Sequence, residues 1–343
     1  MPNKKRGRPI PLAAPGLLRP MTSRKRARRV TTMFHKLTKE RDQALKEGDA
    51  DKARSCERSL EEMGGRPEYQ RASQLSTSFH STSRWVLGHL ANNGWLYGIK
   101  KQALDESGGS TRRERRKQSA RRRTTRILEV GAINTELLDA AGIPAAAATA
   151  RPSPRKAADA SGATPRSTGA AAKNIHVRAI DIHSMEERIE EADFLELPLV
   201  HPDREERYDV IVCSMVLNCV TTAVDRGKML ALLYHQLRPG GLCFFTVPKF
   251  CLTKSAFLTH GLFKKMLGEK GVGFRVVSTR ESPRVAFFVL ERPPEEKDGG
   301  GEESRPARQL DPVFTREIIR NKGKKFPNQF SVVLRSEHVF GTD

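Results

Sequence analysis

The stretch Tyr208-Asp209-Val210-Ile211-Val212-Cys213-Ser214 is the most informative part of this sequence. Its apolar run has the length of a buried strand, and a helical pattern follows over residues 226–237. The turn Arg238-Pro239-Gly240-Gly241 then leads into a second apolar run, residues 242–247. A strand, a loop, a helix, a turn and a strand in this order predict neighbouring parallel strands in an α/β sheet.

Four more apolar runs of strand length lie around this pattern: residues 127–130, 175–180, 274–277 and 285–290. Turns and helical segments separate them, as in a parallel α/β sheet. The last two runs are joined by a polar loop that contains Pro283, which favours an antiparallel hairpin. We therefore expect an α/β fold with a seven-stranded, mostly parallel sheet that ends in an antiparallel hairpin. The seven strands are these six runs and a third strand before Asp193-Phe194.

The first predicted strand ends in Glu129-Val130-Gly131. In doubly wound sheets a nucleotide ligand lies beyond the carboxyl end of this strand, and a glycine allows the backbone close to it. Ile133 and Thr135 occupy the places of later glycines, so an ordinary strand, turn and helix is the alternative. The motifs G-x-G-x-x-G, G-x-x-x-x-G-K-[ST] and G-x-S-x-G are absent, which argues against a dehydrogenase, a P-loop ATPase and a hydrolase.

Three further positions are candidates for contact with such a ligand. Asp181 ends the second strand, where a carboxylate can accept hydrogen bonds from both ribose hydroxyls; removing the low-complexity segment 143–173 restores the usual spacing of about 20 residues from Gly131. Asp193-Phe194 can read an adenine, with the ring on the base face; the alternative is a helix-capping Asp beside a core Phe. Cys213, which ends the fourth strand, is the third candidate.

The charge of the chain is unevenly distributed. The net charge is +21, and residues 1–126 hold about 31 Lys and Arg against about 12 Asp and Glu. This predicts a polyanionic partner, although basic tails can also serve nuclear import alone. Lys4-Lys5-Arg6 and the cluster at residues 24–29 are typical of import signals. Arg6-Gly7-Arg8-Pro9 also resembles a minor-groove arm, but a plain import signal is favoured.

Composition divides the chain into several parts. We expect a disordered basic tail over residues 1–30 and a partly disordered C-terminal tail over residues 293–343. Between them we expect a helical extension at 31–110, a solvated basic linker at 111–126 and the sheet domain at 127–292, with 143–173 looped out. The five cysteines lack disulfide or zinc spacing, and no run of 18 apolar residues occurs. The sequence therefore predicts no structural metal and no membrane span.

Taken together, these residues resemble the fungal 25S ribosomal RNA adenine-N(1)-methyltransferase family over about residues 60–292. The resemblance rests on the segments already quoted at Glu129, Asp181, Asp193 and Cys213-Ser214-Met215-Val216-Leu217-Asn218-Cys219-Val220. It extends to Arg226-Gly227, Met229-Leu230, Cys251-Leu252, Ser282-Pro283-Arg284-Val285-Ala286-Phe287 and, upstream, Gly64-Gly65, Tyr69-Gln70 and Ala72-Ser73. The family shares the glycine-poor first motif.

The resemblance implies a Rossmann-like class I methyltransferase that uses S-adenosyl-L-methionine and methylates one adenine of large-subunit rRNA in the nucleolus. It implies Gly131 and Asp181 as cofactor contacts, with Glu129, Asp193, Phe194 and Cys213 around them. Ribosomal RNA and the nuclear import machinery are the expected partners. An animal relative of similar fold senses the cofactor without catalysis, so an S-adenosylmethionine-binding sensor or adaptor is the alternative.

Adenine N(1) has an in-plane lone pair, so methylation there needs no general base before attack. The enzyme must instead hold that nitrogen in line with the methyl group and exclude water. The loop after Cys213 overhangs this place and offers Ser214 and Asn218 as polar groups. We expect Asn218 to bond the edge of the base. Phe250 is a second candidate, for stacking on the base, although core packing is favoured for it.

Overall fold

The computed structural model of the protein describes residues 21–77, 82–97, 99–100, 122–141, 174–184, 186–198, 207–294 and 309–341. The chain forms two compact units, Met1–Phe79 and His80–Asp343, and each is described by itself. The low-complexity segment and the cluster Lys4-Lys5-Arg6 lie outside the described residues. None of the helices in these ranges is long and apolar enough to cross a membrane.

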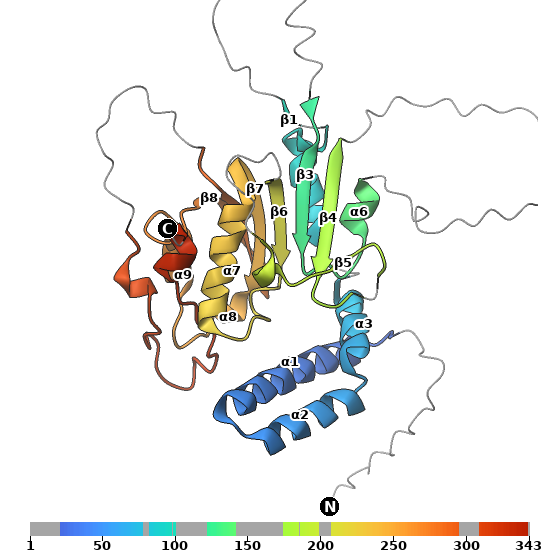
Figure 1. The fold of residues 1–343 in the computed structure, drawn as a ribbon, viewed down its shortest axis with the longest axis vertical. Coiled ribbons are helices and arrows are strands. Elements are labelled where there is room, and N and C mark those ends of the chain that lie inside the picture. Colours follow the sequence, from blue (N-terminus) through green and yellow to red (C-terminus); the bar gives the residue numbers. More distant parts are fainter. Residues whose placement is uncertain are drawn as a thin grey trace, which may run out of the picture. The chain divides into compact units, whose positions relative to one another are not determined.

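The N-terminal unit consists of three helices: α1 (Arg24–Glu47), α2 (Ala50–Glu62) and α3 (Gly65–Thr77), drawn in blue in Figure 1. Ser23 caps α1 by accepting a hydrogen bond from the Arg26 amide, and Gly48 ends that helix at a φ of 75°. The Asp49 carboxylate accepts from the Lys52 amide and starts α2. Local capping signals therefore set both helix boundaries at this turn.

An aromatic cluster joins α1 to α3. The rings of Phe34 and Tyr69 stack with their centroids 4.4 Å apart, and the guanidinium of Arg66 lies over the Tyr69 ring at 5.5 Å. Arg26 Nη2 donates to Glu68 Oε1 at 2.8 Å. Arg26 belongs to the basic cluster at 24–29, which forms the first turns of α1. This part of the chain was expected to be a disordered tail and is helical instead.

A seven-stranded sheet forms the centre of the second unit (Figure 1). Its strands are β3 (Thr125–Val130), β4 (Ile175–Asp181), β5 (Glu190–Glu191), β6 (Tyr208–Ser214), β7 (Leu237–Pro248), β8 (Arg275–Glu281) and β9 (Val285–Glu291). They lie in the order β5-β4-β3-β6-β7-β9-β8. The first five are parallel, and β9 runs antiparallel to both of its neighbours, β7 and β8. The predicted seven-stranded sheet with its terminal hairpin is confirmed. The chain reverses its direction of winding between β3 and β6, the switch point where doubly wound sheets bind ligands.

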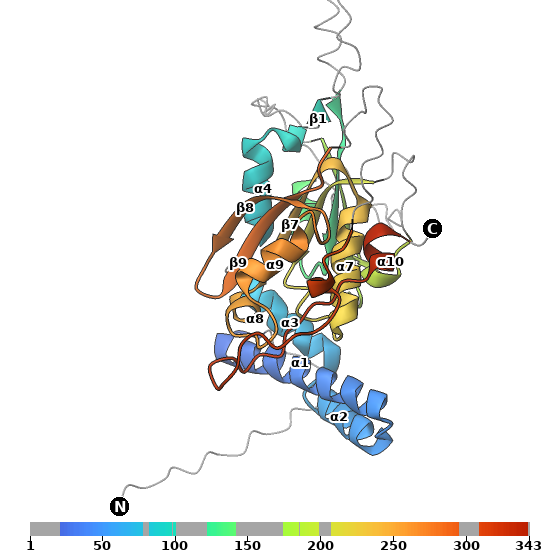
Figure 2. The same cartoon turned by 90° about the vertical axis from the view of Figure 1, so that its left-hand side faces the viewer.

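Helices cover both faces of this sheet. One face packs on α4 (Thr82–Asn92) and α6 (Glu136–Ala140), and the other packs on α7 (Ala223–Gln236) and α9 (His260–Leu267). Figure 2 shows α4 and α7 on opposite sides of the sheet. Two successive aromatic residues of β7 point to opposite faces of the sheet, as successive side chains of a strand do. Phe244 meets Trp85 of α4 with centroids 5.2 Å apart, whereas Phe245 meets Phe263 of α9 at 5.9 Å. Since α4 belongs to this unit, the expected helical extension over 31–110 is divided between the two units.

The described part of the C-terminal tail completes the core. After η3 (Pro312–Phe314) an extended segment runs to α10 (Ser336–Phe340). It buries the apolar side chains Phe314, Phe330, Val332, Val333, Leu334 and Val339. The Val333 amide donates to the Ala223 carbonyl at 2.9 Å, and the Val333 carbonyl takes the space that a side chain on Gly227 would need. Residues 309–341 are therefore part of the sheet unit rather than a peripheral tail.

The end of the expected basic linker is also ordered. Arg123 lies in β2 (Arg122–Arg123), which pairs with β1 (Ile99–Lys100). Both ends of its guanidinium bind the Asp209 carboxylate, with Nη1 to Oδ2 at 2.9 Å. Asp209 is 1% exposed and also accepts from the Arg126 amide at 2.8 Å. Arg123 is thus the partner of a buried charge and not a solvated linker residue.

Candidate functional site

The candidate site lies at the carboxyl ends of β3, β4 and β6. After β3 the chain turns at Gly131, whose φ of 70° is rare for any residue with a side chain. The amides of Gly131 and Ala132 both donate to the Ile180 carbonyl of β4 at 2.9 Å. The side chain of Val216, in the loop after β6, fills the space next to the Gly131 Cα atom. A glycine is therefore required here both by the turn and by this close approach.

Glu129, two residues earlier, carries a buried carboxyl group. The residue is 9% exposed, and its Oε2 atom has no hydrogen-bond partner among the described residues. Burial, with a smaller contribution from the charge of Glu136, raises the pKa of Glu129 to about 8. A buried acid without a partner is unfavourable in the charged form unless a cation or a donor reaches it. This position, predicted to contact the cofactor, is therefore suited to a positively charged group.

Asp181 ends β4 beside this turn, as predicted. Its Oδ1 accepts from the His183 amide at 3.0 Å, and its carbonyl accepts from the Ala192 amide at 2.9 Å. These bonds hold the strand end next to β5 and leave the carboxylate half-buried at the same edge as Gly131. A carboxylate placed there can accept from a diol, so the ribose contact stays a prediction.

In the Asp193-Phe194 pair, the aspartate caps a helix and the phenylalanine lies in the core, which is the alternative to an adenine contact. Asp193 is exposed and caps η2 (Phe194–Glu196), since its Oδ1 accepts from the Leu195 amide at 2.9 Å. The ring of Phe194 is 3% exposed and packs in the core. An adenine contact by this ring would need a change in packing; the Asp193 side of the prediction stays untested.

The loop after β6 is strained and tightly fastened. Met215 has a φ of 61°, a conformation that is uncommon for a residue with a long side chain. Its amide donates to the Thr246 carbonyl of β7 at 3.1 Å. At the other end of the loop, Arg226 donates to the carbonyls of Val220, Thr221 and Ser331 at 2.9, 3.1 and 2.7 Å. One buried guanidinium thus connects the loop, α7 and the C-terminal segment.

Asn218 lies in this loop, and the two polar atoms of its side-chain amide differ in their contacts. The side chain is half-buried, and Nδ2 donates to Cys219 Sγ at 3.5 Å. The Oδ1 atom is buried and has no hydrogen-bond partner in the described ranges. A buried amide oxygen without a partner is unfavourable by itself and is available to accept from a ligand.

A chain of hydroxyl groups crosses the same edge of the sheet. Ser214 Oγ lies 2.7 Å from Thr82 Oγ1 at the start of α4 and 3.0 Å from Thr246 Oγ1 in β7. Sequence reasoning named Ser214 and missed both threonines, which come from distant segments. Cys213, the residue before, is fully buried; burial raises the pKa of its thiol to about 12. Its side chain is therefore a neutral part of the core, and only its backbone can face a ligand.

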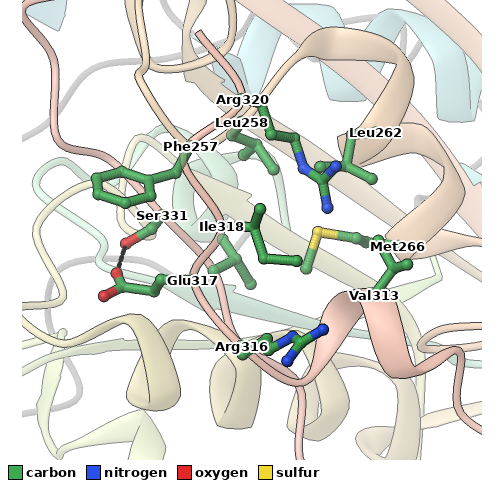
Figure 3. Close-up of a pocket in the computed structure, with 11 residues that line it drawn as sticks. Phe257, Leu258, Leu262, Met266, Val313, Arg316, Glu317, Ile318, Arg320 and Ser331 are labelled. Carbon is green, nitrogen blue, oxygen red and sulfur yellow. Dashed lines mark hydrogen bonds between the residues drawn. The ribbon is translucent and has the colours of Figure 1, made fainter. Parts of the chain in front are cut away.

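A small cavity elsewhere in this unit has no connection with these groups. It has a volume of about 10 Å³ and is lined by α9 and the C-terminal segment, with Met266, Ile318 and Arg316 among its walls (Figure 3). That space holds one water molecule at most. None of its lining residues comes from β3, β4 or the loop after β6. No group of three or more His, Cys, Asp or Glu that could hold a metal occurs in the described ranges.

The sheet order, the switch point between β3 and β6, and the acid and glycine at the end of β3 define a Rossmann-like class I methyltransferase fold. Residues 162–332 match the profile of the family described as 25S rRNA (adenine(2142)-N(1))-methyltransferase, Bmt2. Over these residues the chain belongs to this family.

A Saccharomyces cerevisiae protein, 25S rRNA (adenine(2142)-N(1))-methyltransferase, is 31% identical over 116 residues. This similarity covers 34% of the present chain and only 33% of the yeast protein, so it spans a third of that relative's length.

Solved structures of low similarity include three methyltransferases. A putative sarcosine dimethylglycine methyltransferase from Galdieria sulphuraria has a TM-score of 0.37 and 10% identity, over 65% of this chain and 88% of that one. The N-methyltransferase NodS from Bradyrhizobium japonicum, with S-adenosyl-L-homocysteine, has a TM-score of 0.29 and 15% identity, over 62% of this chain and 100% of that one. The Thermus thermophilus 16S rRNA N2 G1207 methyltransferase has a TM-score of 0.29 and 13% identity, over 52% of this chain and 38% of that one. Because these TM-scores are low, the fold assignment rests on the strand order alone.

Proposed function

We propose that this protein is an S-adenosyl-L-methionine-dependent methyltransferase that modifies N(1) of an adenine in large-subunit (25S) rRNA. The observation that carries the proposal is the buried carboxyl group of Glu129 at the switch point of the sheet, whose Oε2 atom has no hydrogen-bond partner among the described residues. The family membership of residues 162–332 supports the same reaction.

The residues at this edge fit the cofactor. S-adenosylmethionine carries an ammonium and a sulfonium charge, and a buried acid without a partner is stabilised by a cation. Asp181 is placed to accept from ribose hydroxyls, and the turn at Gly131 brings backbone rather than side chain to the edge. When bound, the cofactor supplies an electrophilic methyl group.

The side chains around the target base have positioning roles. Adenine N(1) attacks through its own lone pair, so no residue has to remove a proton first. Asn218 Oδ1, which is buried and has no partner in the part of the chain that the structure describes, can accept from the exocyclic N(6) amine next to that nitrogen. The fastened loop around Asn218 would hold the base in line for attack. This edge of adenine is used in base pairing, so the target must be unpaired or extruded.

The test is methyl transfer from tritiated cofactor to rRNA taken from a strain that lacks the protein, followed by digestion and mapping of the label. We expect label on N(1) of a single adenine, and none with the variant Glu129→Gln. Cofactor binding without any transfer would contradict the proposal and fit the sensor alternative instead. Label on another atom of the base would also overturn it.

We propose further that the protein acts in the nucleus and nucleolus and reaches them through the import machinery. The basic cluster Lys4-Lys5-Arg6 supports this, whereas the cluster at 24–29 forms part of α1 and contributes Arg26 to a contact with Glu68. Replacing Lys4, Lys5 and Arg6 with alanine in a fluorescent fusion should reduce nuclear accumulation. Replacing the exposed Lys264 and Lys265 of α9 is the matched control. Equal localisation of both variants would contradict the assignment of this signal.

A further inference from the structure

The C-terminal segment carries a dense group of positive charges. Residues 316–325 contain five Lys and Arg and one acidic residue, Glu317. Arg320, Lys322, Lys324 and Lys325 are exposed, and none of them forms an ion pair with an acid in the described part of the chain. Such a concentration of like charge opposes folding unless a counter-charge binds to it.

Backbone contacts hold these charges at one place. The Arg320 amide donates to the Ala256 carbonyl at 2.8 Å, and the Ala256 amide donates to the Asn328 carbonyl at 2.9 Å. Buried Ser255 donates through Oγ to the Phe330 carbonyl at 2.6 Å. The segment is thus attached to the connection between α8 (Lys249–Thr253) and α9, and its basic side chains are not used in that attachment.

This attachment lies at the end of the sheet that carries the candidate site. α8 follows β7 directly, at the carboxyl end of the sheet where β6 and the Asn218 loop also end. Figures 1 and 2 both show the C-terminal segment beside α8 at this end of the sheet. The segment that carries the charges is therefore attached at the same end of the sheet as the Asn218 loop, to which Arg226 joins it through the Val220 and Ser331 carbonyls.

α8 adds an aromatic ring to this surface. Phe250 is 50% exposed, so the expectation of core packing for it is wrong. The Lys254 amide donates to the Phe250 carbonyl at 3.0 Å, and the exposed Lys254 side chain also has no ion pair with a described acid. Exposed rings beside cations are the combination that binds single-stranded nucleic acids, because bases stack while phosphates pair with the charges.

We infer that Phe250, Lys254, Arg320, Lys322, Lys324 and Lys325 form an RNA-binding surface, here called the C-terminal basic surface. It holds the unpaired strand on either side of the target base, independently of the basic N-terminal residues. The choice of RNA rests on the proposed function, but the binding itself requires no methyl transfer. An acidic protein would also pair with the positive charges, but it offers no bases to stack on the exposed Phe250 ring. This difference favours RNA as the partner.

The test measures the affinity of the full-length protein for a labelled single-stranded RNA of about 12 nucleotides at several salt concentrations. In the variant Lys322→Gln, Lys324→Gln, Lys325→Gln, we expect the slope of log K against log salt to become less steep by about 2, since each lost phosphate contact removes roughly 0.7. Phe250→Ala should weaken binding at least fivefold and leave the slope unchanged, because stacking releases no counterions.

The matched control is Lys264→Gln, Lys265→Gln, Lys270→Gln, which removes three exposed charges from α9 and the turn after it. We expect this control to keep the wild-type slope. An equal loss in both triple variants, or no loss in either, would overturn the inference, as would competition by polyglutamate as strong as by unlabelled RNA. Because binding is measured without cofactor, failure of the surface and failure of the proposed methylation give separate results.

Discussion

The side chain of Val216 occupies the space that a side chain on Gly131 would need. This contact joins the turn after β3, the strand that contains Glu129, to the strained loop after β6, which contains Asn218. The glycine is thus explained by a contact within the protein as well as by its φ of 70°. A variant at Gly131 will therefore disturb the loop as well as any ligand that approaches the turn.

We expect Gly131→Ala to destabilise the sheet unit and Val216→Ala to relieve part of that loss. The left-handed backbone accounts for about 1–2 kcal/mol of the effect, and the contact with Val216 adds to it. Chemical denaturation of both single variants and the double variant gives the coupling energy. Strict additivity of the two single effects would contradict the contact.

Glu129→Gln should stabilise the protein at alkaline pH and weaken cofactor binding at least tenfold. Glutamine keeps the shape of the side chain and removes the charge that burial opposes. In the folded protein the pKa is raised from 4.5 to about 8, so the native state binds more protons than the unfolded state between these values. Stability from this group is therefore full below about pH 4.5 and is lost as pH rises toward 8.

The measurement is urea unfolding of the wild type and Glu129→Gln from pH 5 to pH 9 without cofactor. The difference between the two should grow with pH and level off above about 8. Histidines with lowered pKa, such as His35 and His235, affect both proteins equally and cancel. A difference that is constant over this range would mean that Glu129 has a partner in solution.

Most of the sheet could be predicted from the sequence because β3, β4, β6, β7 and β9 each contain a continuous apolar run between local turn signals. The short strand β5 consists of two exposed glutamates and has no such signal. The acid and the glycine after β3 and the acid after β4 were also predictable, since their places depend on strand ends. The pairing of Arg123 with Asp209, 86 residues apart in sequence, has no local signal. The same holds for Thr82 beside Ser214.

The C-terminal segment shows why composition misled. Its apolar residues at 330–334 form one short run after a charged, Gly-rich stretch, so nothing local marks them as core. They are buried because Gly227 lets the backbone of Val333 lie directly on α7 and because Arg226 binds the Ser331 carbonyl. Such a contact depends on tertiary packing and cannot be inferred from the segment alone.

Leu334→Ala should therefore destabilise the sheet unit by about 2–5 kcal/mol, as expected for a large side chain that is fully buried. Arg335→Ala, at the exposed neighbour, is the matched control and should change stability by less than about 0.5 kcal/mol. Denaturant midpoints of the two variants decide the matter. A Leu334 variant as stable as the wild type would mean that the segment leaves the core in solution.

Asn218→Ala should reduce kcat/KM for methyl transfer about 10- to 100-fold, because the amide oxygen no longer accepts from the target base. Its affinity for the cofactor should stay within twofold of the wild type, and Asn218→Asp, which keeps an acceptor, should retain more activity than alanine. The decisive comparison uses an RNA whose target adenine is replaced by purine, which has N(1) but lacks the N(6) amine. The wild type should lose about as much activity on this RNA as Asn218→Ala loses on adenine, whereas Asn218→Ala should hardly distinguish the two RNAs. If the variant discriminates between them as strongly as the wild type does, Asn218 does not bind the base edge, and its unpaired oxygen serves the loop alone.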